Sequence, residues 1–280
     1  MGLSQVDQDV EETDDERADS TTILLDRAEA LYRVAQLGYD AKQMDKTITC
    51  LTNTSEYMLK RETKLRKRLV GYSVEGVGIV WSESYEPSWF VDAVDMLRYC
   101  LFQKERYQEA VDLLQKVEDK CLKYGNDPDE EFVNLVYQAA GELLDQYLHQ
   151  PKEAEEKYRK GLEVYKRRNV TQEMANKYNG DIEETRNKFY GSKMAIFLNG
   201  IAYAQAHQQH YDEALESIEQ AIELQPEEAN YYDSKGEILY MKGDKQGARN
   251  MWEKVISINS NFVEEYDSEL YKLLYKQKSK

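Results

Sequence analysis

The sequence is poor in the residues that break helices or staple small folds. Only 4 of its 280 residues are proline and only 3 are cysteine. Cys50, Cys100 and Cys121 show no Cys-x-x-Cys spacing, so neither a zinc site nor a disulfide framework is predicted. We interpret them as small buried hydrophobic residues in a reducing compartment. A single bridge between two of them is also compatible with the sequence.

Long apolar runs and an excess of cations are lacking as well. No stretch approaches the roughly 18 consecutive apolar residues that cross a bilayer, and the N-terminus carries no apolar leader. We therefore expect no membrane insertion and a cytoplasmic location, with export after removal of a leader as the alternative. The 37 Lys and Arg residues are outnumbered by 53 Asp and Glu, giving a net charge of −16. No nucleic-acid partner is predicted, because phosphate affinity needs clustered cations.

Motifs of catalysis and of cofactor binding are missing too. The sequence has no P-loop, nucleophile elbow or His-Glu-x-x-His motif. His207 and His210 have a metal-compatible spacing, with Asp212 nearby. However, a helix is expected to end between the two histidines, and no motif supplies a third ligand. The sequence therefore predicts a protein that is not an enzyme and that binds no metal or cofactor.

What the chain does contain is an internal repeat with a period of 34 residues, between Leu198 and Phe262. Similar residues recur at the paired positions Ala202 and Gly236, Ala214 and Ala248, Ile218 and Trp252, Ala221 and Val255, Ile222 and Ile256, and Leu224 and Ile258. This period is typical of stacked helix-turn-helix units. The small residues allow two helices to approach closely, and the larger ones fill the space between one helix pair and the next.

The second copy reads Tyr232-x-x-Lys235-Gly236-x-x-Leu239, followed by Ala248-x-x-x-Trp252. This resembles the tetratricopeptide repeat, in which an aromatic residue, a Leu-Gly pair and a Tyr precede Ala and Phe. The first copy keeps Ala214-x-x-x-Ile218 and ends at Pro226. The resemblance implies an all-α fold of helix-turn-helix repeats, stacked as a right-handed solenoid that is irregular in its N-terminal half. It also implies a scaffold for protein–protein or protein–peptide interaction.

In such repeats the first helix of each pair lines a concave groove. The residues that the resemblance places there are Asn199, Tyr203, His207, Asn230, Asp233, Glu237, Tyr240 and Met241. Asp233 and Glu237 would repel a carboxylate, so we expect a basic or neutral partner rather than an acidic chaperone tail. Two alternatives stay open. The array could be a regulatory sensor for a small peptide or ligand, or these residues could contact only one another and water.

The repeat also divides the chain into four expected segments. Residues 1–20 form an acidic disordered tail, 21–194 form degenerate helical repeats, 195–262 form two regular units, and 263–280 form a capping helix with a frayed end. Alanines 110, 154, 214 and 248 mark the second helices. Their separations are 44, 60 and 34, so only the last matches the period.

Two stretches in the first half do not follow the repeat. The basic cluster at 60–68 is interpreted as a solvated helix end, with a patch for an acidic peptide, a phosphate group or the chain's own tail as alternatives. Residues 70–90 are rich in glycine and aromatics and are predicted to be a loop between helix pairs. A ligand contact surface, a lid or an enzymatic site are the alternatives there. Gly76-x-Gly78 lacks the helix that a phosphate-binding loop requires.

Turn and cap residues predict several helix boundaries. Asp40 is expected to start a helix that runs to about residue 59. Asn179-Gly180 predicts a turn, after which a helix resumes at Asp181. Gly243-Asp244 is expected to end one helix and to start the next. Pro226 is expected at the first position of a following helix.

Overall fold

The computed structural model describes residues 41–60, 66–74, 78–86, 89–123, 130–178 and 180–262. The acidic tail at 1–20, the expected helix that follows it, and the expected capping helix at 263–280 lie outside these residues. The chain divides into two compact units, 1–129 and 130–280, and each is described by itself.

The first unit contains three described helices, α2 (Ala41–Lys60), α3 (Trp89–Gln103) and α4 (Tyr107–Lys123). Helix α2 packs on α3, and α3 packs on α4. Leu51, Val94 and Leu114 are fully buried between them. The helix expected from Asp40 is confirmed as α2. Ala110, in the first turn of α4, is also fully buried, as expected of an alanine that marks the second helix of a pair.

A β-hairpin stands between α2 and α3, where the sequence predicted a loop. Strand β1 (Arg66–Val74) pairs antiparallel with β2 (Gly78–Glu86), from Arg66 opposite Glu86 to Val74 opposite Gly78. The prediction of a loop at 70–90 was therefore wrong. The interpretation of the basic cluster at 60–68 as a helix end was also wrong, because residues 66–68 belong to β1. β-branched and aromatic residues that recur through both strands favour extended backbone, and this preference outweighs the glycines. The remaining described elements are helical.

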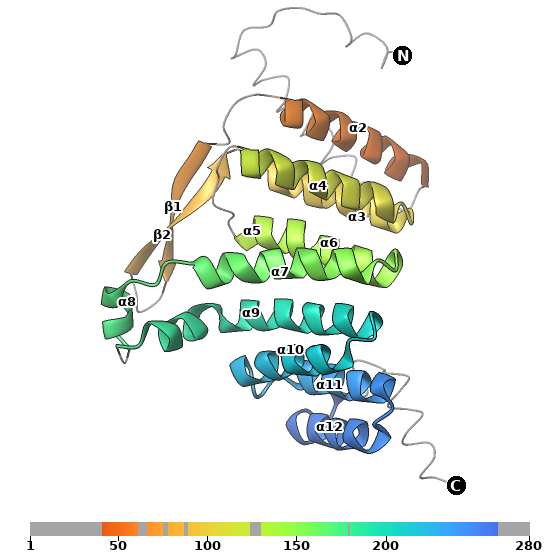
Figure 1. Cartoon of the computed structure of the whole chain (residues 1–280). Coiled ribbons are helices and arrows are strands. Elements are labelled where there is room, and N and C mark those ends of the chain that lie inside the picture. Colours follow the sequence, from red (N-terminus) through yellow and green to blue (C-terminus); the bar gives the residue numbers. More distant parts are fainter. Residues whose placement is uncertain are drawn as a thin grey trace, which may run out of the picture. The chain divides into compact units, whose positions relative to one another are not determined.

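The second unit is entirely helical in its described residues (Figure 1). Its elements in chain order are α5 (Glu130–Val133), η1 (Asn134–Ala139), α6 (Ala140–Glu142), η2 (Leu143–Tyr147), α7 (Pro151–Arg167), α8 (Gln172–Asn176), α9 (Ile182–His207), α10 (Tyr211–Leu224), α11 (Ala229–Lys242) and α12 (Lys245–Ile258). The first four follow one another without a break, and η1 and η2 are π-helical. Residues 130–147 therefore form the first helix of a pair, and α7 is the second helix of that pair.

Successive helices of this unit pack side by side. Helix α9 contacts α7 on one side and α10 on the other, and α11 contacts both α10 and α12 (Figure 1). Ala154, Ala214 and Ala248 lie in the first turn of the second helices of the three pairs and are all completely buried. The stacked helix pairs predicted from these small residues are confirmed.

Glycines permit the closest approaches. The ring of Tyr158, on α7, lies between Gly141 of α6 and Gly200 of α9. A Cβ atom at either glycine would come within 2.6 and 2.7 Å, respectively, of that ring. Because interiors are close-packed and yield little, only glycine fits at both positions.

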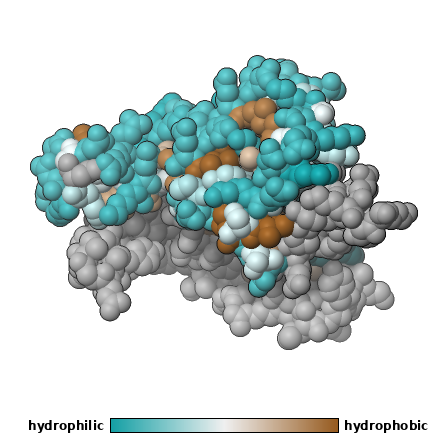
Figure 2. Space-filling model, turned by 90° about the horizontal axis from the view of Figure 1, so that it is seen from below, coloured by the Kyte–Doolittle hydropathy of each residue, from teal (hydrophilic) through white to brown (hydrophobic). Residues whose placement is uncertain are grey.

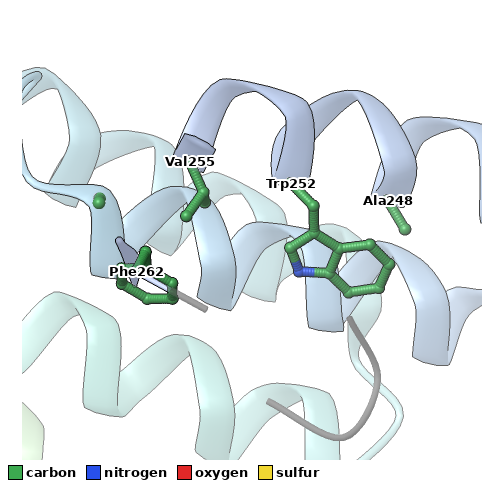
Figure 3. Close-up of a cluster of buried hydrophobic side chains, with 5 residues drawn as sticks. Ala248, Trp252, Val255 and Phe262 are labelled. Atoms are coloured by element: carbon green, nitrogen blue, oxygen red, sulfur yellow. The ribbon is translucent and has the colours of Figure 1, made fainter. Parts of the chain in front are cut away.

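The last helix pair has its own hydrophobic core (Figure 3). Ala248, Trp252 and Val255 of α12 pack with Ala229 and with Phe262, which follows the helix. Trp252 is 1% exposed. Its truncation to alanine would cost about 3–5 kcal/mol of stability, the usual range for a large buried aromatic residue.

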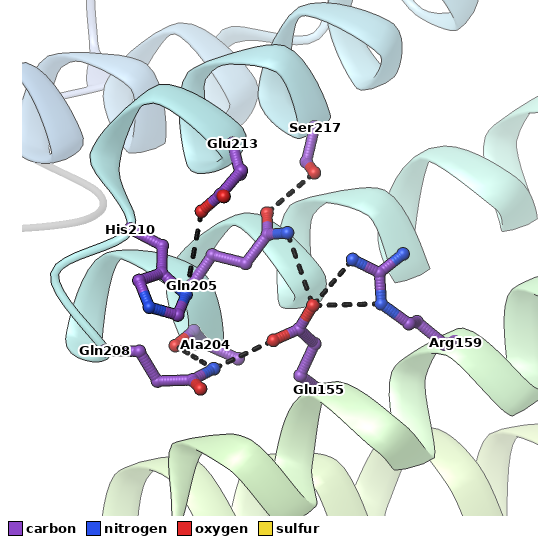
Figure 4. A network of polar contacts seen from close by, with 8 residues as sticks. All are labelled: Glu155, Arg159, Ala204, Gln205, Gln208, His210, Glu213 and Ser217. Carbon is purple, nitrogen blue, oxygen red and sulfur yellow. Dashed lines mark hydrogen bonds and ion pairs between the residues drawn. The ribbon is translucent and has the colours of Figure 1, made fainter.

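A polar network centred on the buried Gln205 and Ser217 joins α7, α9 and α10 (Figure 4). Glu155 of α7 accepts hydrogen bonds from Gln205 of α9 (3.3 Å) and from Gln208 (2.8 Å), the C-cap of that helix, and pairs with Arg159 (2.6 Å). The Ser217 hydroxyl of α10 donates to the side-chain oxygen of Gln205 at 2.8 Å. Each buried group thus has a partner, so the network adds specificity to the helix register without leaving polar atoms unpaired.

Two of the three helix boundaries predicted in the second unit agree with the structure. Gly180 has a φ of 85° and Asp181 caps α9 by accepting from the Glu184 amide, as predicted. Gly243, with a φ of 97°, ends α11, and Asp244 caps α12, also as predicted. Pro226 does not start a helix, because α11 begins at Ala229. The proline lies in the preceding turn, where its carbonyl accepts a hydrogen bond from the Tyr232 hydroxyl (3.1 Å).

The surface in Figure 2 is mainly hydrophilic among its coloured residues, and the hydrophobic ones form a few separate patches. Scattered exposed apolar residues of this kind are normal on a folded protein.

Candidate functional site

The predicted groove residues lie on the first helices of the last two pairs. Asn199, Tyr203 and His207 are spaced by four along α9 and therefore share one face of that helix. The other five lie on α11. His207 is exposed and the remaining seven are half-buried.

Tyr203 and Glu237 are brought together across the two helices. The Tyr203 hydroxyl donates a hydrogen bond to Oε2 of Glu237. Burial raises the pKa of Tyr203 well above its ordinary value, and the charge of Glu237 raises it further. The phenol therefore remains a protonated donor at any physiological pH.

Asp233 lies one turn before Glu237 on α11 and points back into the last pair. The Trp252 indole Nε1 donates to its Oδ1 at 2.9 Å. Burial raises the pKa of Asp233 from 3.8 to about 6, and the neighbouring charge of Glu237 adds to this increase. The hydrogen bond from Trp252 lowers the pKa and offsets part of the increase. This carboxylate therefore changes charge within a biologically accessible pH range.

His207 extends the site toward the preceding pair. Its Nδ1 lies 2.8 Å from Oδ1 of Asp145 on η2, a carboxylate that is only 5% exposed. The hydrogen bond to Asp145 raises the pKa of His207. The Tyr203 and His207 ring centroids are 6.2 Å apart, so the two contacts adjoin.

The other predicted residues are less closely joined to this group. Asn199 has a buried side-chain oxygen with no hydrogen-bond partner among the described residues. Asn230 donates to Glu228 at the start of α11 (2.9 Å), and the Tyr240 ring packs 6.4 Å from Trp252. Met241 is half-buried, and no polar contact assigns it a role.

Asp145 and Trp252 contact predicted site residues but were missing from the sequence prediction. Asp145 lies in a helix pair whose spacing departs from the 34-residue period, so the repeat could not align it with the groove. Trp252 was assigned to the core, which is correct for its ring. Its indole N–H was the missed signal, because a buried indole usually has an acceptor.

The resulting candidate site contains three carboxylates, Asp145 on η2 and Asp233 and Glu237 on α11, with α9 between these two first helices. One oxygen of each is bound to His207, Trp252 or Tyr203, respectively. Within the described ranges, the second oxygen of each forms no hydrogen bond. Such a set can accept hydrogen bonds from cationic or amide groups.

Neither a metal site nor a membrane-spanning helix is present in the part of the chain that the structure describes. No group of three or more His, Cys, Asp and Glu side chains there is arranged to hold a metal ion. None of the described helices is both long enough and apolar enough to pass through a bilayer.

Comparison with known proteins agrees with this architecture. The family model of the tetratricopeptide repeat matches residues 195–228. A sequence search of curated proteins found no match.

Several solved structures resemble the chain. A putative kinesin light chain from Podosopora anserina with TPR-like repeats has a TM-score of 0.56 at 15% identity, over 87% of this chain and 98% of that one. BtubC from P. vanneervenii has a TM-score of 0.51 at 14% identity, over 90% and 93%. MamA has a TM-score of 0.51 at 13% identity, over 90% and 97%. At such identities the likeness shows the fold alone.

The stacked helix pairs and the matched motif define a helical-repeat protein. More specifically, residues 195–228 form a tetratricopeptide repeat, and the fold of the stacked pairs is that of TPR-like repeat structures. Arrays of this kind are typically scaffolds for protein–protein interaction and are usually not catalytic.

Proposed function

We propose that this chain is a non-enzymatic scaffold that binds a protein or peptide segment in the groove lined by η2, α9 and α11. The observation that carries the proposal is the row of carboxylates at Asp145, Asp233 and Glu237. Each is anchored through one oxygen. Asp233 and Glu237 are half-buried and offer the accessible acceptors, whereas the buried Asp145 adds negative charge beneath His207. Anchored groups lose little side-chain entropy when a partner binds, and such preorganisation favours affinity.

The charge of the row favours a basic or neutral partner. A partner with lysine or arginine side chains would find two half-buried carboxylates on α11 and a third negative charge on η2, whereas an acidic segment would be repelled. The net charge of −16 acts in the same direction, because it attracts cationic segments before contact. An aromatic residue, Tyr203, stands among the carboxylates and offers a face for packing.

A peptide backbone would also find an acceptor in the groove. The side-chain oxygen of Asn199 is buried and has no donor among the described residues. Buried polar atoms nearly always have a partner in folded proteins. A backbone N–H from a bound segment would supply one once the Asn199 side chain turns outward, since its oxygen is buried in the free protein.

The test is a pull-down from native lysate with two matched double variants. Asp233→Lys with Glu237→Lys reverses two groove charges, and binding of the captured partner should fall at least tenfold. Glu216→Lys with Glu227→Lys changes the net charge equally at exposed positions outside the row, and binding should persist.

A third variant separates charge from folding. Asp233→Asn with Glu237→Gln keeps the side-chain shapes. It should weaken the binding of a basic partner less than the double lysine variant does. Unchanged recovery with the lysine pair, when circular dichroism shows it folded, would refute the groove. Equal loss in the Glu216 and Glu227 control would mean that bulk charge alone drives binding.

A further inference from the structure

A second cleft lies on the face of α9 that is turned away from the groove. It has a volume of about 450 Å³ and is formed where α9 runs between α7 and α10. At 100° per residue, Met194 and Leu198 lie roughly half a turn around α9 from the stripe of Asn199, Tyr203 and His207. The cleft is therefore separate from the proposed groove.

The lining of this cleft is apolar at its base. Leu162 of α7 and Met194 and Leu198 of α9 are each at most 6% exposed, and Leu224 of α10 closes one side. The volume lies within the range of known small-ligand sites, which bury apolar groups against a few polar ones.

Arg186 is the unusual residue of the cleft. It is half-buried, its Nε atom is fully buried, and that atom has no acceptor among the described residues. None of the described ion pairs includes Arg186, although Glu183 and Glu223 also line the cleft. A buried charged donor without an acceptor is costly, so this guanidinium has unused capacity for an anionic partner.

Arginine presents five donors in a planar fork that matches a carboxylate. Lys166, also in the lining, is exposed and lies 3.9 Å from Glu163, a long ion pair that holds it weakly. The cleft thus combines an apolar base with one under-used guanidinium and one loosely held ammonium at its edge.

We propose that this cleft binds a peptide segment that carries an aliphatic side chain next to a carboxylate. The aliphatic group occupies the base between Leu162, Met194 and Leu198, and the carboxylate accepts hydrogen bonds from Arg186. This preference for an acidic segment is opposite to that of the groove, and the inference does not rest on the groove being functional.

The test uses the full chain with ¹³C-labelled methionine and leucine methyl groups, titrated with N-acetyl-leucine. The Met194 and Leu198 methyl resonances should shift and saturate. N-acetyl-leucinamide, which lacks the carboxylate, should bind at least fivefold more weakly.

Three variants assign the site. Arg186→Gln should weaken the binding of N-acetyl-leucine at least fivefold, and Arg186→Lys should weaken it less. Glu223→Gln should strengthen the binding, because it removes a repelling charge. Arg186→Gln is expected to fold normally, since the native side chain makes no ion pair, and an unchanged melting temperature checks this.

Several results would overturn the proposal. Equal binding of the amide, or binding unaffected by Arg186→Gln, would show an apolar cavity without carboxylate recognition. Shifts confined to groove residues would place the ligand elsewhere. Tighter, Arg186-dependent binding of octanoate than of N-acetyl-leucine would assign the cleft to a fatty acid and not to a peptide.

Discussion

Tyr203 on α9 donates a hydrogen bond to Glu237 on α11, and the two residues are 34 positions apart, which is the period of the repeat. They therefore occupy the same position in successive units. An aromatic residue in one unit and a carboxylate in the next form the contact that joins neighbouring first helices. Two glutamates at this position could not make it, because an ionised carboxylate has no donor.

Replacing Tyr203 by Phe tests that contact. The change keeps the ring and removes the donor, leaving a half-buried Glu237 oxygen unpaired. We expect a loss of about 1–2 kcal/mol in the free energy of unfolding, measured by urea denaturation. Tyr211→Phe is the control, because Tyr211 is also half-buried and no described residue hydrogen-bonds its hydroxyl. An equal effect in both variants would remove any special role of Tyr203.

Asp233 gives the fold a predictable pH dependence. Its folded pKa of about 6 exceeds its ordinary 3.8, so between these values the native state holds more protons than the unfolded state. Stability should therefore fall as pH rises from about 4 to 6 and then level off. Asp233→Asn still accepts the Trp252 bond and should abolish this slope, with a gain of about 1–3 kcal/mol at pH 7.

The measurement is urea denaturation of both proteins from pH 4 to 7. His207, whose pKa is raised from 6.5, contributes a stabilisation that is lost only at higher pH, so it does not obscure this window. Parallel slopes for wild type and Asp233→Asn would contradict the assignment.

Two glycines of α9 form a matched pair for a packing test. Gly200→Ala would place a Cβ 2.7 Å from the Tyr158 ring, which is held on its other side by Gly141. The clash should cost about 1–3 kcal/mol. Gly191→Ala meets its nearest neighbour at 3.7 Å and should instead stabilise by about 0.5–1 kcal/mol through helix propensity. Thermal denaturation separates the two, and similar melting temperatures would argue against a close-packed α7–α9 interface.

The sequence predicted the parts of the fold that local chemistry determines. Ala214 and Ala248 are buried because a 34-residue period places small side chains at each helix crossing. Asp181 and Asp244 cap helices because an aspartate after a glycine turn satisfies the first free amides. Both signals lie within a few residues of the structure that they specify.

Other features depend on contacts between distant residues, and these were missed. Asp233 and Glu237 were predicted as groove residues from their helix position, but their partners Trp252 and Tyr203 depend on how the pairs stack. Asp145 could not be found without the register between η2 and α9. The β-hairpin was missed because glycines were taken as loop signals, whereas cross-strand pairing decided the backbone.

The polar network around Glu155 and Gln205 has a consequence for the order in which the second unit unfolds. Helix α9 is bound by side-chain hydrogen bonds to both α7 and α10. Among the described helices, α12 packs extensively only on α11. Thermal fraying should therefore begin at the C-terminal pair and stop at α9. The last pair would then open and reclose many times before the rest of the unit melts.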